Sequence, residues 1–175
     1  TQVLASTPTP IRALTTQAPQ LQPTVTKPTA LFAHEVQYGI GNISQMAYDP
    51  DGNRLFLGSS TGVRVLQVPN YATLAVVADV APVKALALSL DGNTIAVATL
   101  DSIVALDLRD LSERWRISRA VDSLAFSPDS TVLATTSNPR SGSTLDEWSS
   151  ANGELVREIA AEDVLFDIVF SPSGD

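Results

Sequence analysis

Apolar and polar residues alternate along the chain in a pattern that recurs four times. The recurring segments are 43–52, 83–92, 121–130 and 165–174, and each leads into a turn built from Ser, Pro, Asp and Gly. The last positions of successive segments lie 40, 38 and 44 residues apart. This regular spacing predicts one structural unit repeated along the chain.

Each recurring segment has the same order of side-chain types. Two apolar positions flank one small position, and they predict a strand with a large apolar face and a small-residue face. The large columns are Met46, Leu86, Leu124 and Ile168, and Tyr48, Leu88, Phe126 and Phe170; the small column is Ala47, Ala87, Ala125 and Val169. Apolar residues on both faces indicate sheets that pack between two other sheets.

Three more strands are predicted after each of the first three segments. The turn at 49–52 has Pro50 where φ near about −65° is needed and Gly52 at the fourth position, as in a type I turn. The expected second strands are 55–57, 95–97 and 133–135, and the fourth are 73–78, 112–117 and 154–159. The third strand is clearest at 63–68 and 103–108, and in the third repeat it contains Asp146 and Glu147.

No segment shows a helical period, so the chain is predicted to be all-β. A repeat near 40 residues made of short strands is typical of a β-propeller. We expect blades of four antiparallel strands at about 43–79, 83–119 and 121–160, with the start of the next at 165–175. Three blades and part of a fourth would form an incomplete ring.

The repeats resemble the WD-repeat β-propeller family and related bacterial propellers over about residues 31–175. The third repeat is the most similar, in 124–129, in Leu133-Ala134 and in 148–154. Leu66 and Leu106 stand where the family has Trp, and no Gly-His pair precedes a first strand. The resemblance therefore implies a degenerate type, without the complete His-Ser-Asp-Trp hydrogen-bond network of the family.

Rings of this family typically close by pairing the N-terminal strand with the last blade. The resemblance assigns that role to 31–40, where Phe32, His34, Val36 and Tyr38 alternate with other residues. The chain lacks an initiator Met and ends in a turn, so we interpret it as a fragment of a longer protein.

Residues 1–30 differ in composition from the rest. They hold eight Thr, five Pro and four Gln, and only Arg12 and Lys27 are charged. Such a segment cannot bury enough apolar surface to offset its chain entropy, so we expect a disordered linker or stalk. A stalk that follows an upstream anchor and an ordinary interdomain linker both fit. The stalk-like composition and the absence of Cys favour a location outside the cytoplasm, in the cell envelope or secreted, but do not establish it.

Composition excludes several classes of function. The chain carries 11 Lys+Arg against 19 Asp+Glu, a formal charge of −8, which argues against nucleic acid as the partner. Zero Cys and one His exclude a disulfide framework, thiol catalysis and the usual zinc sites. No run of 18 apolar residues is present, so no transmembrane helix is predicted. We expect no cofactor and no metal.

Three short patterns suggest chemistry that their context does not support. Ser60, in 58–62, matches a nucleophile elbow, but it joins two strands and the single His lies upstream. Asp49, Asp51 and Asn53 are spaced as in a calcium loop, but its Gly and Glu are misplaced and a tight turn needs the same residues. His34, on an alternating strand, is best interpreted as a half-buried structural side chain.

Two further groups bear on partner binding. Arg114, Arg116 and Arg119 accompany Trp115 on an outer strand, where charges protect a sheet edge. The insertion 137–143 predicts an irregular, exposed loop. Asp146 and Glu147 follow it as consecutive acids, and one of them should face a neighbouring sheet. The candidate interaction loop is Asn138, Pro139, Arg140, Ser141, Gly142, Asp146 and Glu147.

These observations favour a non-enzymatic β-propeller scaffold that binds a protein partner. No residue is assigned a catalytic role. Two alternatives stay open: the propeller portion of a hydrolase, lactonase or serine peptidase, and the sensor domain of a membrane-bound regulator. Both would need catalytic or signalling segments that these residues do not supply.

Overall fold

The computed structural model describes residues 41–139 and 142–174, all within one compact unit, Tyr38–Asp175. The predicted linker at 1–30, the predicted closing strand at 31–40 with His34, and the loop residues Arg140 and Ser141 lie outside the described residues. Among the described residues there is no helix, and so none that could span a membrane.

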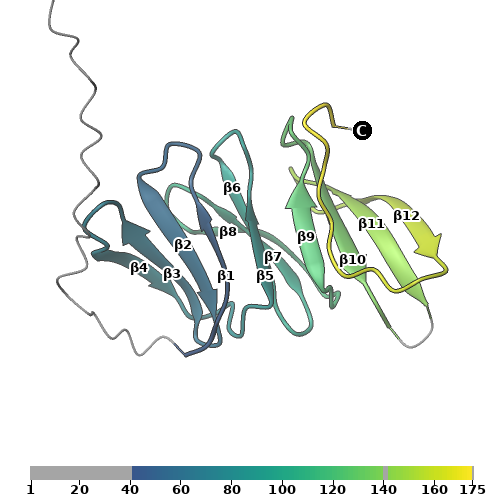
Figure 1. Ribbon diagram of the computed structural model, residues 1–175, viewed down its shortest axis with the longest axis horizontal. Coiled ribbons are helices and arrows are strands. Elements are labelled where there is room, and N and C mark those ends of the chain that lie inside the picture. Colours follow the sequence, from purple (N-terminus) through teal and green to yellow (C-terminus); the bar gives the residue numbers. More distant parts are fainter. Residues whose placement is uncertain (1–40, 140–141, 175) are drawn as a thin grey trace, which may run out of the picture. The chain divides into compact units, whose positions relative to one another are not determined.

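In the described part of the chain, twelve strands form three four-stranded antiparallel sheets, as the repeats predict (Figure 1). The first sheet holds β1 (Ile43–Tyr48), β2 (Arg54–Ser59), β3 (Gly62–Gln67) and β4 (Thr73–Val77). The second holds β5 (Ala85–Leu88), β6 (Thr94–Ala98), β7 (Ile103–Asp107) and β8 (Glu113–Ile117). The third holds β9 (Ser123–Phe126), β10 (Val132–Ser137), β11 (Ser143–Ser149) and β12 (Leu155–Ala161). Strands follow one another in sequence order within each sheet, and the sheets do not close into a ring.

The turn that ends each recurring segment has the same geometry four times. A backbone N–H at the fourth position donates to the carbonyl of the first, from Gly52, Gly92, Ser130 and Gly174 to Asp49, Ser89, Ser127 and Ser171. The donor residue has φ between 62° and 86° in all four turns. Ser130 keeps the left-handed conformation in the repeat that lacks Gly at this position. This conformation is higher in free energy for a residue with a Cβ than for Gly.

The third and fourth strands of every sheet share one irregularity. Their register shifts by one residue between Val65 and Leu66, between Ala105 and Leu106, and between Glu147 and Trp148. The second residue of each pair is the one aligned with the family's Trp position. The bulge is therefore a constant feature of the repeat, including the two repeats that lack Trp.

The first and second sheets share one hydrophobic cluster. Phe56, Val63 and Val65 of the first sheet are in the same core as Leu86, Ile95 and Val97 of the second, all at most 2% exposed. Ala47 of the small column packs against this cluster. The large-residue face of β5 thus lies toward the small-residue face of β1.

The second and third sheets meet differently. The second sheet contributes alanines, Ala85, Ala96, Ala98 and Ala105, and the third contributes Leu124, Phe126, Leu133 and Trp148. Trp115, from β8, is 9% exposed, belongs to this cluster, and donates from its indole to the carbonyl of Ser150 at 2.9 Å. Small residues on one sheet leave room for aromatic residues on the other.

The outward face of the first sheet departs from the expectation that inner strands are covered on both sides. Met46 and Tyr48, aligned with the buried Leu86 and the half-buried Leu88, are 60% and 53% exposed. They point away from the second sheet, and more than half of each residue is exposed. Beside them, on the same face of the sheet, Leu55, Leu57 and Leu66 form a third buried cluster.

Residues 165–174 follow the third sheet and pair with no strand among the described residues. Ser123 donates to the carboxylate of Asp167 at 2.6 Å, which joins the segment to β9. Ile168 and Phe170 are half-buried, whereas Phe166 and Val169 are 85% and 81% exposed. That this segment begins a fourth blade stays a prediction.

Candidate functional site

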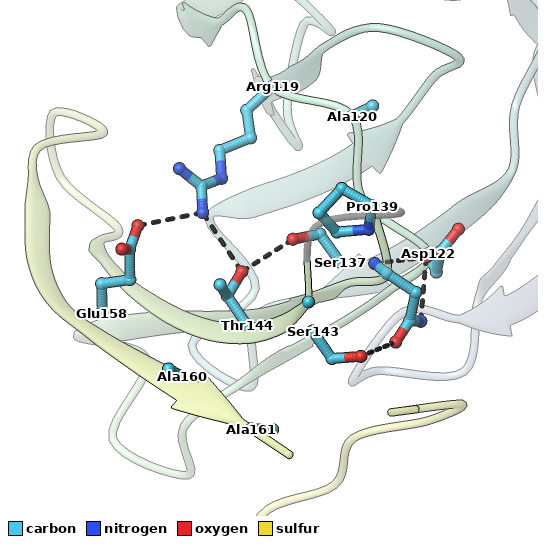
Figure 2. A pocket seen from close by; sticks show the side chains of 12 residues that line it. Arg119, Ala120, Asp122, Ser137, Pro139, Ser143, Thr144, Glu158, Ala160 and Ala161 are labelled. Atoms are coloured by element: carbon cyan, nitrogen blue, oxygen red, sulfur yellow. Dashed lines mark hydrogen bonds and ion pairs between the residues drawn. The ribbon is translucent and has the colours of Figure 1, made fainter. Parts of the chain in front are cut away.

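A cleft of about 660 Å³ lies at one end of the third sheet. Its walls come from the linker between β8 and β9, the end of the β10–β11 hairpin and the last residues of β12 (Figure 2). Short side chains form much of its lining, namely Ala120, Ser137, Ser143, Thr144, Ala160 and Ala161. Because these side chains are short, the cleft can accept groups that project from another molecule.

Arg119 stands at the edge of this cleft and bridges two carboxylates. Its Nη2 lies 2.6 Å from Oδ2 of Asp146 and 3.1 Å from Oε2 of Glu158. The same nitrogen donates to the hydroxyl of Thr144 at 3.2 Å (Figure 2). The guanidinium also lies 5.7 Å from the ring centre of Trp148, in cation–π range. One cation is thus shared between two acids on β11 and β12.

Asp146 is fully buried, behind the lining of the cleft. None of its side chain is exposed, and its Oδ1 has no hydrogen-bond partner among the described residues. Desolvation raises the pKa of this carboxyl, and the charge of Arg119 opposes that rise. The residue shares the inward face of β11 with Trp148, as expected from the alternation of a strand.

Asn138 connects the hairpin to the segment that follows the third sheet. Its Oδ1 accepts from the N–H of Leu165 at 2.8 Å and from the hydroxyl of Ser143 at 2.7 Å. Its Nδ2 donates to the carbonyl of Leu165 and to the carboxylate of Asp122. All its side-chain hydrogen-bonding groups are therefore used to hold this end of the repeat together.

Asp122 closes another side of the cleft. Lys84 donates to its Oδ1 at 2.7 Å and to the carbonyl of Val121 at 3.0 Å. The hydrogen bond from Lys84 is the main cause that lowers the pKa of Asp122. This pair links the start of the second repeat to the start of the third.

The structure brings part of the predicted interaction loop to this cleft. Asn138, Pro139 and Gly142 line it, whereas Asp146 lies behind it and can make no direct contact with a partner. The predicted irregular excursion is also shorter than expected, because Ser143 already begins β11. Of the two consecutive acids, Asp146 faces a neighbouring sheet, as expected for one of them.

Glu147 points to the opposite face of β11, where it pairs with Arg157. The two line a second, smaller hollow of about 340 Å³ with Phe170. Sequence reasoning missed Arg119 and Glu158 as residues of the cleft. They lie far apart along the chain, and only the packing of the linker against β12 joins them.

The other candidate residues have structural roles. Ser60 is in the turn between β2 and β3 and accepts from the N–H of Asn42 at 3.2 Å. Asp49 accepts from the N–H groups of Asn53 and Arg54 and pairs with the Arg54 side chain, so its oxygens are occupied. No group of three potential metal ligands occurs among the residues described.

The arginines around Trp115 do not form a basic patch. Arg114 pairs with Asp107, and Arg116 pairs with Glu113 on the same strand. Each arginine is therefore paired with a carboxylate, while the indole is buried. This agrees with an edge strand that presents charge to solvent.

Sequence comparison gives no relative. No protein-family model matches the chain, and no curated protein matches it.

Comparison with solved structures finds several chains with a similar fold. Kuenenia stuttgartiensis hydrazine synthase is similar with a TM-score of 0.69 and 20% identity, over 82% of this chain and 43% of that one. The WD40 repeats of RRP9 are similar with a TM-score of 0.65 and 19% identity, over 73% of this chain and 41% of that one. U3-55K is similar with a TM-score of 0.63 and 19% identity, over 71% of this chain and 40% of that one. The chain thus spans about two fifths of each of these structures. At such identities the likeness shows the fold alone, which is that of WD40-type propeller blades.

Proposed function

We propose that this chain is part of a non-enzymatic β-propeller scaffold of the WD type, and that the cleft at the end of the third sheet receives a protein partner. The cleft is the observation that carries the proposal. It is open, lined by short polar and small side chains, and placed where a hairpin, a linker and an outer strand meet. A rigid sheet that presents such loops is a common basis for binding.

A binding role fits the cleft better than a catalytic one. A general base needs to reach a proton on a bound substrate. Asp146 is buried, and Asp122 and Glu158 are each engaged with a cation. Ser137 and Thr144 share a hydrogen bond of 2.7 Å, and no described His or Lys lines the cleft to activate either hydroxyl. Hydrazine synthase is an enzyme by name, but its likeness extends to the fold alone.

The proposal includes a larger propeller, and the resemblance of the repeats to bacterial propellers and the stalk-like composition of residues 1–30 favour a bacterial source. The three sheets do not close into a ring, and the outward faces of the first sheet and of residues 165–174 expose Met46, Tyr48, Phe166 and Val169. Further blades would cover such faces. The Thr/Pro-rich residues 1–30 would then act as a linker or stalk.

Site-specific photo-cross-linking tests the binding role. In one variant a photoreactive benzoylphenylalanine replaces Ala161 in the cleft. In a control variant it replaces Gln67, the exposed last residue of β3 in the first sheet. We expect a discrete cross-linked protein from position 161 and not from position 67. The cross-linked protein is then identified by mass spectrometry, purified and titrated against the chain.

A cleft-filling substitution makes the titration decisive. Ala160 is exposed in the cleft, so Ala160→Trp fills the space without disturbing the core. We expect the dissociation constant of the purified partner to rise by about tenfold or more, which corresponds to about 1.4 kcal/mol. Val76→Trp, at an exposed position of β4, is the matched control. Equal affinity of the wild type and Ala160→Trp would overturn the proposal.

A further inference from the structure

We infer that the cleft recognises an extended, basic segment of its partner, in which a Lys or Arg side chain bonds to Glu158 while the backbone pairs with the free edge of β12. This inference rests on the proposed function, because it names the chemistry of the partner at the same site. Three independent features of the described residues support it: the charge of the cleft, the difference between repeats and the open strand edge.

Among the described residues, the group of charges around Arg119 is acidic. Arg119 is a single cation between two carboxylates, Asp146 and Glu158, so this group carries one negative charge in excess. Asp146 is committed to Arg119 because it is buried, whereas the side chain of Glu158 is 49% exposed. A second cation from outside can therefore bind Glu158 while Arg119 keeps its contact with Asp146.

The acidic group is specific to the third repeat. Strand register aligns Val104 with Asp146 and Arg116 with Glu158, and the repeat spacing aligns Ala81 with Arg119. The second repeat thus packs an apolar residue, 0% exposed, where the third buries a carboxylate. A buried ion pair seldom adds more stability than the apolar contact it replaces. Packing alone accordingly does not explain these residues, whereas recognition of a cation does.

The open edge of β12 gives the partner its direction. β12 pairs with β11, and no described strand pairs with its other edge. Nearly all of its residues are exposed, among them Leu155, Val156 and Ile159, and its last residues line the cleft. β8, the equivalent strand, instead exposes the charged Glu113, Arg114 and Arg116. A peptide that adds to β12 gains backbone hydrogen bonds and places its side chains alternately on the two faces of the sheet.

Two matched peptides test the inference on the 175-residue chain. One fluorescein-labelled hexapeptide alternates valine and lysine, and the other alternates valine and glutamate. Fluorescence anisotropy should show about tenfold or greater preference for the lysine peptide, with affinity that falls as salt rises because Glu158 is exposed. Equal binding, or preference for the glutamate peptide, would overturn the inference.

Variants locate the site. Glu158→Gln should lower the affinity for the lysine peptide by about tenfold. Glu113→Gln removes a paired acid on β8 and should leave that affinity unchanged. An unchanged affinity in Glu158→Gln would place the peptide elsewhere and contradict the inference.

The two proposals fail in different ways. A cross-linked partner that enters the cleft through a segment without Lys or Arg contradicts the basic-segment inference and leaves the binding role intact. A partner that binds Ala160→Trp normally contradicts both.

Discussion

The indole N–H of Trp148 donates a 2.9 Å hydrogen bond to the hydroxyl of Thr135, inside the interface between the second and third sheets. Trp148 is 5% exposed and Thr135 is 0% exposed. The two residues belong to neighbouring strands, β11 and β10, and no His takes part. A bond of this kind thus persists in a repeat that lacks the Gly-His pair of the WD family.

Breaking this bond should destabilise the fold. Trp148→Phe loses the donor, leaves the buried Thr135 hydroxyl without this partner and removes part of a buried ring, at a cost of about 1–3 kcal/mol or more in the free energy of unfolding. Thr135→Val leaves the indole N–H buried and unpaired, at a cost of about 1–3 kcal/mol. Urea unfolding of both variants and of the double variant measures the coupling, which we expect to be about 1 kcal/mol. Additive effects would show that the hydrogen bond contributes nothing by itself.

Asn138 should hold residues 165–174 against the third sheet. Asn138→Ala removes both bonds to the backbone of Leu165, and hydrogen exchange at that amide should become faster by about tenfold or more. Amides of the first sheet should not change. Asn70→Ala, which removes an exposed turn amide bonded to the N–H of Ala72, is the control. Unchanged exchange at Leu165 would mean that other contacts hold the segment.

The pH dependence of stability should reveal the burial of Asp146. Because burial raises its pKa above the ordinary 3.8, the folded protein keeps a proton there at pH values at which the unfolded chain has lost it. The contribution of Asp146 to stability therefore falls as pH rises through that window. The free energy of unfolding of the wild type minus that of Asp146→Asn should decrease as pH rises from 3.8. Urea curves from about pH 3 to about pH 7 measure it, and a flat difference contradicts the assignment.

Asp122 should behave in the opposite way. Its pKa is lowered, first by the hydrogen bond from Lys84, so its contribution is present above 3.8 and is lost as pH falls through the folded-state value. The free energy of unfolding of the wild type minus that of Asp122→Asn should therefore decrease as pH falls. The same series of urea curves provides the measurement. A difference that grows on acidification would show that Lys84 does not stabilise the ionised carboxylate.

The chain by itself should associate through its open faces. Met46 and Tyr48 on the first sheet, and Phe166 and Val169 after the third, are more than half exposed although they are apolar. Sedimentation velocity should show species larger than the monomer as concentration rises. Tyr48→Lys should reduce this association, whereas Gln67→Lys, at an exposed residue of β3, should not. A stable monomer at all concentrations would contradict the prediction.

Sequence alone predicted the repeats and their strands. Alternation at Leu86, Ala87 and Leu88 places large and small residues on opposite faces, and this local rule holds wherever a strand forms. The four turns follow from residue types such as Pro50 and Gly52, whose backbone preferences are also local. Strand positions, sheet order and the all-β class could be inferred for this reason, although strand ends shifted by a residue or two.

Tertiary structure decided which residues meet. Asn138, Pro139 and Gly142 were found from the insertion that contains them, but Arg119 and Glu158 lie 39 residues apart in the chain and are joined only when the linker packs against β12. Burial likewise depends on neighbouring sheets. Tyr48 and Phe126 occupy the same place in their repeats, yet one is exposed and the other is buried, because a described sheet covers only the second. Local patterns specify the strand and its faces, while burial and charge pairing depend on contacts between residues distant in sequence.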